Sequence, residues 1–249
     1  DEVLAMWQAF DQHVTTPLAE AGLPFAVTPG NHDGANGERF ALERALYRAQ
    51  WTPRRPAVDF VDAADYPFNY AFRVRDVLFV SLDATHVGHL SPRRRAWLDA
   101  LLQTQGPKFQ HRVVFSHVPL WPFALGRERD YLGDHALEAI LQRGKVGVFL
   151  SGHHHAYYPG YKDGVRFVSQ GCLGAAPRPL LGTAQPSPRS ITLLALGPGG
   201  QVQIDAYAGS GFDEPVARAT LPPQITAHGA TMVRDDIALQ GQPGAPLPR

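Results

Sequence analysis

Apolar positions along the chain recur at two spacings, one typical of helices and one typical of strands. Between residues 2 and 21 they recur every three or four positions, which predicts an amphipathic helix that Gly22 ends. Further helices are predicted over residues 38–50 and 134–142, and a helix opens at Ser91-Pro92, where Ser91 suits the N-cap and Pro92 the first turn. Shorter runs predict strands at residues 25–28, 69–74, 77–82, 112–115, 146–150, 165–169, 191–195 and 202–207.

The order of these elements predicts an α/β sandwich, because strands alternate with helices in the first part of the chain and strands alone follow. Residues 69–82 are expected to form a hairpin that turns at Arg75-Asp76. The Pro-rich stretch 51–67 is predicted as a surface excursion. Residues 221–249, rich in Pro and Gly, are predicted to be a peripheral, partly mobile tail outside a domain of residues 1–220.

Composition excludes several classes of protein. The 249 residues are 44% hydrophobic and 18% charged with a net charge of zero, so nothing indicates general nucleic-acid binding or attachment to a membrane surface. No apolar run approaches the roughly 18 residues that a membrane-spanning helix needs. The single Cys172 excludes intrachain disulfides and thiolate-cluster zinc sites, and leaves the cellular compartment open. Neither composition nor pattern indicates an oligomeric state.

Three short polar strings follow three of the predicted strands. They are Gly30-Asn31-His32-Asp33, Ser116-His117-Val118-Pro119 and Ser151-Gly152-His153-His154-His155. Polar side chains at the C-terminal ends of buried strands are how an α/β protein builds a metal or catalytic site. We therefore expect Asn31, His117 and His153 to converge at one edge of the sheet.

The three consecutive histidines suggest metal binding. If their segment is extended, His153 and His155 point to the same side with Cα atoms roughly 6.5–7 Å apart, while His154 points away. Both imidazoles could then reach one metal ion, or two ions roughly 3.5–4 Å apart. The alternative is a His-rich surface loop. His117, taken alone, also fits a hydrogen-bonded structural histidine.

The string around Asn31 also has two interpretations. It can be a plain turn, because Gly, Asn and Asp tolerate positive φ. It can equally be chemical: the Asn31 oxygen can ligate a cation, His32 can protonate a leaving oxygen, and Asp33 can fix the tautomer of His32. A serine hydrolase is disfavoured, because Ser116 and His117 are strand neighbours that point to opposite faces and no Gly-x-Ser-x-Gly elbow occurs.

Together the three strings resemble those of the calcineurin-like metallophosphoesterase superfamily. Their sequences look most like those of its purple-acid-phosphatase-like branch. The resemblance implies a four-layer α/β/β/α sandwich of two mixed sheets. It further implies that Asn31, His117 and His153 ligate one metal ion and His155 a second, and that His32 protonates the leaving group while Asp33 orients it.

The resemblance covers the last three of the family's five metal-binding blocks, over residues 30–155. The first two, an Asp-x-His and a Gly-Asp pair, are not found before residue 30, apart from Asp11-Gln12-His13 inside the predicted helix. The chain also opens at Asp1 without Met. We therefore expect an N-terminally truncated piece whose first strands and remaining ligands lie upstream and whose own activity is impaired.

The function implied by the resemblance is hydrolysis of phosphate esters at a dinuclear metal centre, with a metal-bound hydroxide as nucleophile. Donors without thiolate suit Mn, Fe, Zn or Co, and the choice between these divalent ions is open. The substrate would be a small or macromolecular phosphate ester, either a monoester or a diester. The rival interpretation is a catalytically inactive phosphoesterase-fold scaffold that binds a protein partner.

Overall fold

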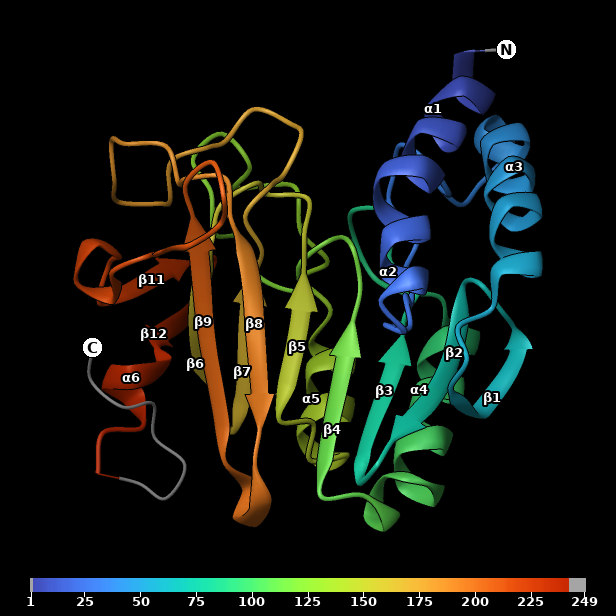
Figure 1. The fold of residues 1–249 in the computed structure, drawn as a ribbon. Helices are drawn as coiled ribbons and strands as arrows, with labels where there is room; N and C mark the ends of the chain where they lie inside the picture. Colours follow the sequence, from blue (N-terminus) through green and yellow to red (C-terminus); the bar gives the residue numbers. More distant parts are fainter. Residues whose placement is uncertain (1, 242–249) are drawn as a thin grey trace.

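The computed structural model describes residues 2–241 and arranges them around two β-sheets (Figure 1). The larger sheet has nine strands in the order β1-β2-β3-β4-β5-β7-β6-β12-β11, and the smaller has three in the order β10-β9-β8. The strands are β1 Asp59–Asp65, β2 Asn69–Val74, β3 Val77–Ser81, β4 His111–Phe115, β5 Val148–Ser151, β6 Tyr158–Lys162, β7 Val165–Ser169, β8 Ile191–Leu196, β9 Val202–Ala208, β10 Glu214–Pro215, β11 Gln224–Ala227 and β12 Ala230–Arg234.

Parallel pairing at the centre of the larger sheet sets the geometry of the molecule. Strands β3, β4, β5 and β7 run parallel, whereas the outer strands pair antiparallel, so this sheet is mixed. The smaller sheet is antiparallel throughout. Parallel neighbours need a crossover, which α4 (Pro92–Thr104) supplies between β3 and β4 and α5 (His135–Arg143) between β4 and β5. The C-terminal ends of β3, β4 and β5 therefore meet at one edge.

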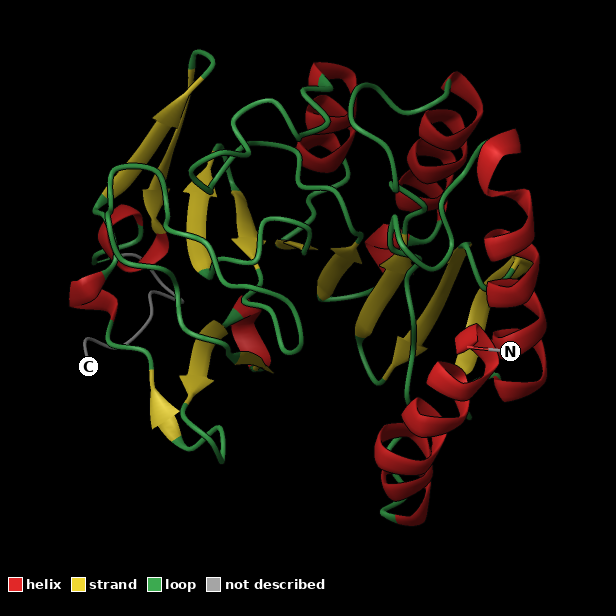
Figure 2. Cartoon of the chain, turned by 90° about the horizontal axis from the view of Figure 1, so that it is seen from above, coloured by secondary structure: helices red, strands yellow, loops and turns green. Residues whose placement is uncertain are grey.

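Helices and the smaller sheet cover the two faces of the larger sheet. Helices α4 and α5 lie on one face; the smaller sheet and the N-terminal helices lie on the other, seen from above in Figure 2. The α/β sandwich predicted from the sequence is confirmed. The remaining helical segments are α1 Glu2–Phe10, η1 Asp11–Thr15, α2 Thr16–Glu20, η2 Glu38–Phe40, α3 Ala41–Trp51, η3 Thr52–Arg54, η4 Gly106–Lys108, η5 Pro198–Gly200, η6 Arg218–Thr220 and α6 Asp235–Ala238.

Aromatic packing attaches the N-terminal helices to the sheet. Tyr47 and Trp51 on α3 are buried, and the ring of Tyr47 stacks on that of Phe68 at a centroid distance of 5.6 Å. Trp7 and Phe10 of α1 add edge-to-face contacts to Trp51 at 5.8 and 6.1 Å. Such pairs contribute about 0.5–1.5 kcal/mol each beyond the burial of their area. The predicted helices over residues 2–21 and 38–50 are thus confirmed.

Two other local predictions were wrong. Residues 25–28 do not pair as a strand; instead the Val27 N–H donates to the Tyr70 hydroxyl at 2.9 Å, and that hydroxyl donates to the Val27 carbonyl. The 51–67 stretch is not only a surface excursion, because it contains edge strand β1. The alternation of apolar and polar residues in β1 is concealed by Asp59, Asp62 and Asp65. The register of β1 against β2 also shifts twice.

The predicted tail is, over its described part, integrated into the larger sheet. Strand β12 pairs with β6, and Ile225 and Met232 are buried. The buried Asp235 forms an ion pair with Arg218. Pro and Gly are frequent in this segment. For this reason its short strands were not recognised from the pattern of apolar and polar residues. Residues 242–249 lie outside the described residues.

A buried carboxylate links the sheet edge to the polar string at residues 30–34. Asp83, completely buried just after β3, accepts hydrogen bonds from Arg44 on α3 and Arg94 on α4, both at 2.7 Å. Arg44 also donates to the Gly34 carbonyl at 2.8 Å. Gly34 itself is needed, because an added Cβ would lie 2.8 Å from the side chain of Pro29. Asp83 thereby holds two helices and the turn in register.

Replacing Asp83 with Ala is expected to lower the free energy of unfolding by about 3–5 kcal/mol, because it leaves two largely buried guanidinium groups without their partner. Asp59→Ala is the matched control. Its carboxylate is 72% exposed and pairs with Arg73 at the surface, where an ion pair contributes under about 1 kcal/mol. Chemical denaturation of both variants makes the measurement, and equal losses would contradict the role of Asp83.

Candidate metal and catalytic site

Three side chains from distant parts of the sequence meet at the edge formed by β4 and β5. His117 Nε2 lies 2.7 Å from Asn31 Oδ1, although the two residues are 86 positions apart. His153 Nδ1 lies 3.2 Å from the same His117 nitrogen, and the two rings meet edge to face. The structure therefore brings Asn31, His117 and His153 together, as the sequence led us to expect. Their role as metal ligands stays a prediction.

The local backbone explains how these residues reach one point. The chain leaves β4 and β5 side by side, and the Gly152 N–H donates to the His117 carbonyl at 2.9 Å. On the other side, the Asp33 carboxylate accepts from the Gly30 N–H at 2.6 Å and closes the turn that presents Asn31. A side chain at position 30 would lie 3.4 Å from the His117 ring, so the glycine lets the turn approach the histidine closely.

The extended segment expected for residues 153–155 is not what the structure shows. His153 and His155 have φ values of 63° and 55°, in the left-handed region that residues other than glycine rarely adopt. The His154 N–H donates to the Gly152 carbonyl at 2.7 Å, so a tight turn replaces the end of the strand. The backbone is strained at the two histidines that were singled out for chemistry, which is typical of functional sites.

His154 points away from the cluster, as predicted. It is completely buried, accepts a hydrogen bond from the Phe123 N–H at 3.1 Å and donates to the Asp130 carbonyl at 2.8 Å. Its side chain therefore serves the fold.

The ring of His155 bonds to a backbone carbonyl. Its Nδ1 lies 3.0 Å from the Ala176 carbonyl, an acceptor, so Nδ1 carries the proton and Nε2 keeps a lone pair. A neutral ring in this tautomer can ligate a metal ion through Nε2.

The electrostatics of the cluster keep its histidines neutral. Burial, assisted by repulsion among the histidines, lowers the pKa of His117 to about 3. Burial, together with the nearby Arg127 guanidinium, lowers the pKa of His153 to about 4. At neutral pH each ring is therefore uncharged and has one nitrogen lone pair available for a cation.

His32 and Asp33 are placed differently from the predicted pair. His32 is exposed beside Asn31. Burial raises the pKa of Asp33, whose carboxylate bonds to the Gly30 N–H. Within residues 2–241 no hydrogen bond joins Asp33 to the His32 ring, so the expected orienting contact is absent and Asp33 instead shapes the turn.

Two residues near the cluster were missed from the sequence. Asp130 lies with its Oδ2 atom 4.0 Å from His153 Nε2, and Arg127 forms an ion pair with the same carboxylate. Both lie in the loop between β4 and α5, where their spacing carries no recognisable signal. Only the fold reveals their proximity to His153.

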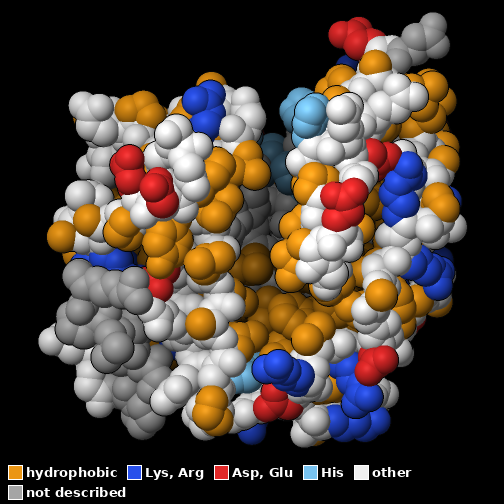
Figure 3. Space-filling view, in the orientation of Figure 1, with side chains coloured by type: hydrophobic (Ala, Val, Ile, Leu, Met, Phe, Trp, Pro, Cys, Tyr) orange, Lys and Arg blue, Asp and Glu red, His pale blue; other side chains and the backbone are white. Residues whose placement is uncertain are grey.

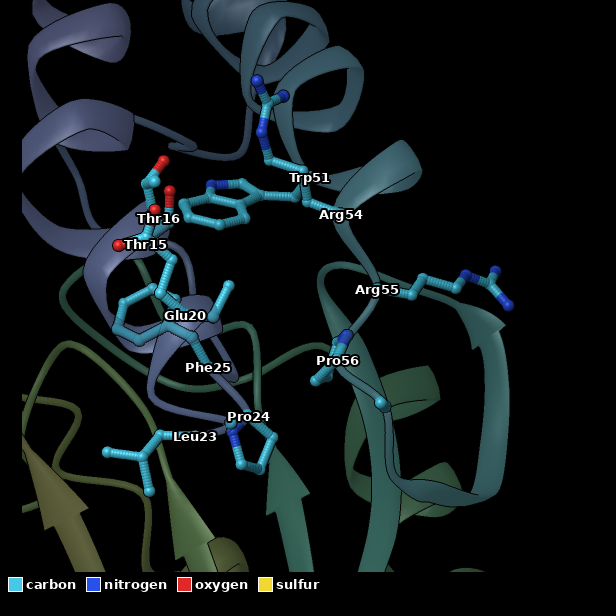
Figure 4. Close-up of a pocket in the computed structure, with 13 residues that line it drawn as sticks. Thr15, Thr16, Glu20, Leu23, Pro24, Phe25, Trp51, Arg54, Arg55 and Pro56 are labelled. Carbon is cyan, nitrogen blue, oxygen red and sulfur yellow. The ribbon is translucent and has the colours of Figure 1, made fainter.

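The molecule has a hollow and a separate pocket on its surface. Figure 3 shows a hollow with hydrophobic side chains on its floor, between the smaller sheet and the N-terminal helices. A separate pocket of about 560 Å³ lies between α2 and η3, where Figure 4 shows Thr15, Trp51 and Arg54. None of the cluster residues lines that pocket, so it is not part of the candidate site.

Comparison with known proteins identifies the family. The family model described as calcineurin-like phosphoesterase matches residues 3–157, which is more than half of the chain. The chain belongs to the calcineurin-like phosphoesterase family. Membership confirms the resemblance drawn from the three strings, and phosphoester hydrolysis is the reaction class of this family.

Two relatives of similar sequence are named as phosphatases. The serine/threonine-protein phosphatase CPPED1 of Bos taurus is 26% identical over 62% of this chain and 49% of its own length. The Mus musculus protein of the same name is 25% identical over 67% and 53%. This member of the calcineurin-like phosphoesterase family thus spans about half the length of these relatives. A dimetal phosphatase from Danio rerio aligns with a TM-score of 0.49 at 18% identity, over 68% of each chain.

The structure was also searched for membrane-spanning helices and for groups of metal-ligating side chains. Within residues 2–241, no helix has both the length and the apolar character needed to cross a membrane. Over the same residues, no group of three His, Cys, Asp or Glu side chains is arranged around a possible metal ion. The cluster of Asn31, His117 and His153 contains two histidine rings and one amide oxygen.

His154 makes the stability of the metal-free protein depend on pH. Burial lowers its pKa to about 4 from an ordinary 6.5, so the unfolded chain takes up the proton first. Its contribution is complete above pH 6.5 and falls by about 3 kcal/mol as the pH drops toward 4. His154→Gln, which keeps a donor and an acceptor, should flatten the loss of stability in this window.

The measurement is urea denaturation with a chelator present, at several pH values between 4 and 7. The exposed His13 supplies the control, because His13→Gln should leave the pH dependence as it is in the parent. A wild-type slope in the His154→Gln variant would show that this ring is not held neutral.

Proposed function

We propose that the protein hydrolyses phosphate esters with divalent metal ions, one held by Asn31, His117 and His153 and a second to which His155 contributes. The observation that carries this proposal is the convergence of Asn31 Oδ1, His117 Nε2 and His153 Nδ1 at separations of 2.7 and 3.2 Å. Family membership supports the same reaction class.

The residues present fit a metal ion. Two ligands that each lie about 2.1 Å from one ion are separated by about 3.0–3.4 Å, close to the distances within this cluster. Both imidazoles are neutral at physiological pH, and His117 presents a lone pair at Nε2 once its proton resides on Nδ1. Nitrogen and amide-oxygen donors without thiolate suit Mn, Fe, Zn or Co.

Bound divalent ions would supply Lewis-acid stabilisation of the negative charge on the phosphoryl oxygens. The protein's own residues provide the remaining steps. His32 is exposed at the turn that carries Asn31, so its ring can approach a bound ester and donate a proton to the departing oxygen. Asp33 fixes the turn through Gly30 and so keeps His32 and Asn31 in a constant relation.

His153→Ala is expected to abolish binding of the ion held by the cluster, since it removes one of three donors. His13→Ala changes an exposed histidine outside the cluster and should leave metal content unchanged. Equilibrium dialysis against Zn²⁺ or Mn²⁺, followed by elemental analysis, compares the two variants. Full metal content in His153→Ala would contradict the assignment of this residue as a ligand.

His32→Ala is expected to lower kcat far more than metal content, because a positioned general acid contributes about 10²–10⁴-fold. The loss should be smallest for esters of acidic phenols, which leave without protonation, and largest for alkyl phosphates. Steady-state kinetics across such a series makes the measurement. Equal losses for all esters would remove the acid role from His32, and metal binding without turnover of any ester would favour the scaffold interpretation.

A further inference from the structure

The loop between β4 and α5 is fastened to the histidine turn at two points. His154 accepts from the Phe123 N–H at 3.1 Å and donates to the Asp130 carbonyl at 2.8 Å, and its side chain is completely buried. Both ends of segment 123–130 are thus fixed to the residue that follows His153. The position of Asp130 relative to His153 is therefore set by the fold and does not depend on a free surface loop.

The two ring nitrogens of His153 face different partners. Nδ1 lies 3.2 Å from His117 Nε2, inside the cluster. Nε2 lies 4.0 Å from Asp130 Oδ2, on the outer side of the ring. Among residues 2–241, Asp130 is the carboxylate found within ion-pair distance of this ring. The ring is thus held between a candidate metal position and a negative charge.

The carboxylate of Asp130 is also bound by Arg127. Its guanidinium forms an ion pair with Asp130 Oδ2, the same atom that faces His153. A backbone hydrogen bond from the Asp130 N–H to the Arg127 carbonyl, 3.0 Å long, holds the two residues in one turn. Arg127 and His153 therefore face the same oxygen atom of Asp130.

We propose that Asp130 is a positioning residue for His153: its carboxylate accepts a hydrogen bond from the Nε2–H group and so directs the Nδ1 lone pair toward Asn31 and His117, while Arg127 opposes this contact. The inference rests on the proposed function, since it assumes that His153 is a metal ligand. A carboxylate behind a ligating histidine fixes its tautomer and raises its basicity, and losing such a partner typically costs 10–100-fold in metal affinity.

The tautomer of His153 tests the proposal without any metal. Long-range ¹H–¹⁵N NMR of the metal-free protein at pH 7 should show the proton of His153 on Nε2. In Asp130→Ala it should be shared between the two nitrogens. The His154 signals serve as an internal control, because that ring bonds to the Asp130 backbone carbonyl, which the substitution keeps. An unchanged His153 tautomer beside intact His154 signals would overturn the proposal.

Affinity for Zn²⁺, measured by titration calorimetry on the full chain, supplies the second readout. Asp130→Ala should weaken binding about 10–100-fold. Glu128→Ala removes a carboxylate from the same loop, one that accepts from the Gly126 N–H, and should leave the affinity unchanged. Equal weakening in both variants would show a general charge effect and overturn the role of Asp130.

The Arg127→Met variant shows whether Arg127 acts by binding Asp130 or by repelling the bound cation directly. If Arg127 acts by occupying Asp130, the substitution tightens Zn²⁺ binding in the wild-type background and has no effect in Asp130→Ala. Equal tightening in both backgrounds would overturn action through Asp130. Wild-type protein that binds no Zn²⁺ or Mn²⁺ would contradict the proposed function instead, and the tautomer measurement would still decide whether Asp130 positions His153.

Discussion

The buried carboxylate of Asp83 is the constraint on which the candidate site depends. It lies between the guanidinium groups of Arg44 and Arg94, and Arg44 continues the chain of contacts to the Gly34 carbonyl. The turn that presents Asn31 has no β-ladder behind it, because the preceding segment bonds to the Tyr70 hydroxyl instead. Charge-assisted hydrogen bonds thus do here what backbone pairing does for His117 and His153.

The other half of the site depends on parallel strands. Because β4 and β5 are neighbours in register, with Phe115 opposite Leu150, their following residues start from the same edge. His117 and His153 then need only short turns to meet. Apolar strand sequences and their order along the chain contain this information, which explains why the convergence of three distant strings was predictable.

The sequence did not reveal how the histidine segment bends or what surrounds it. Residues 153–155 follow an apolar strand, so extension was the natural expectation, but the chain forms a turn with two left-handed residues in which His154 bonds to Phe123 and Asp130. The same limit applies to β1 and β12, whose short alternation is masked by Asp residues in one case and by turn residues in the other. Contacts between distant segments decided these places, and local patterns do not encode them.

His153 and His154 therefore need different surroundings, although they are neighbours in one short segment. His154 must be buried to hold the loop, and burial is compatible with its neutral form because both ring nitrogens are hydrogen-bonded. His153 must keep one nitrogen free for a cation while its ring stays oriented. The turn places the His154 ring against Phe123 and Asp130, while the His153 ring faces His117. The left-handed conformations of His153 and His155 thus occur in a segment that combines a buried histidine with two candidate ligands.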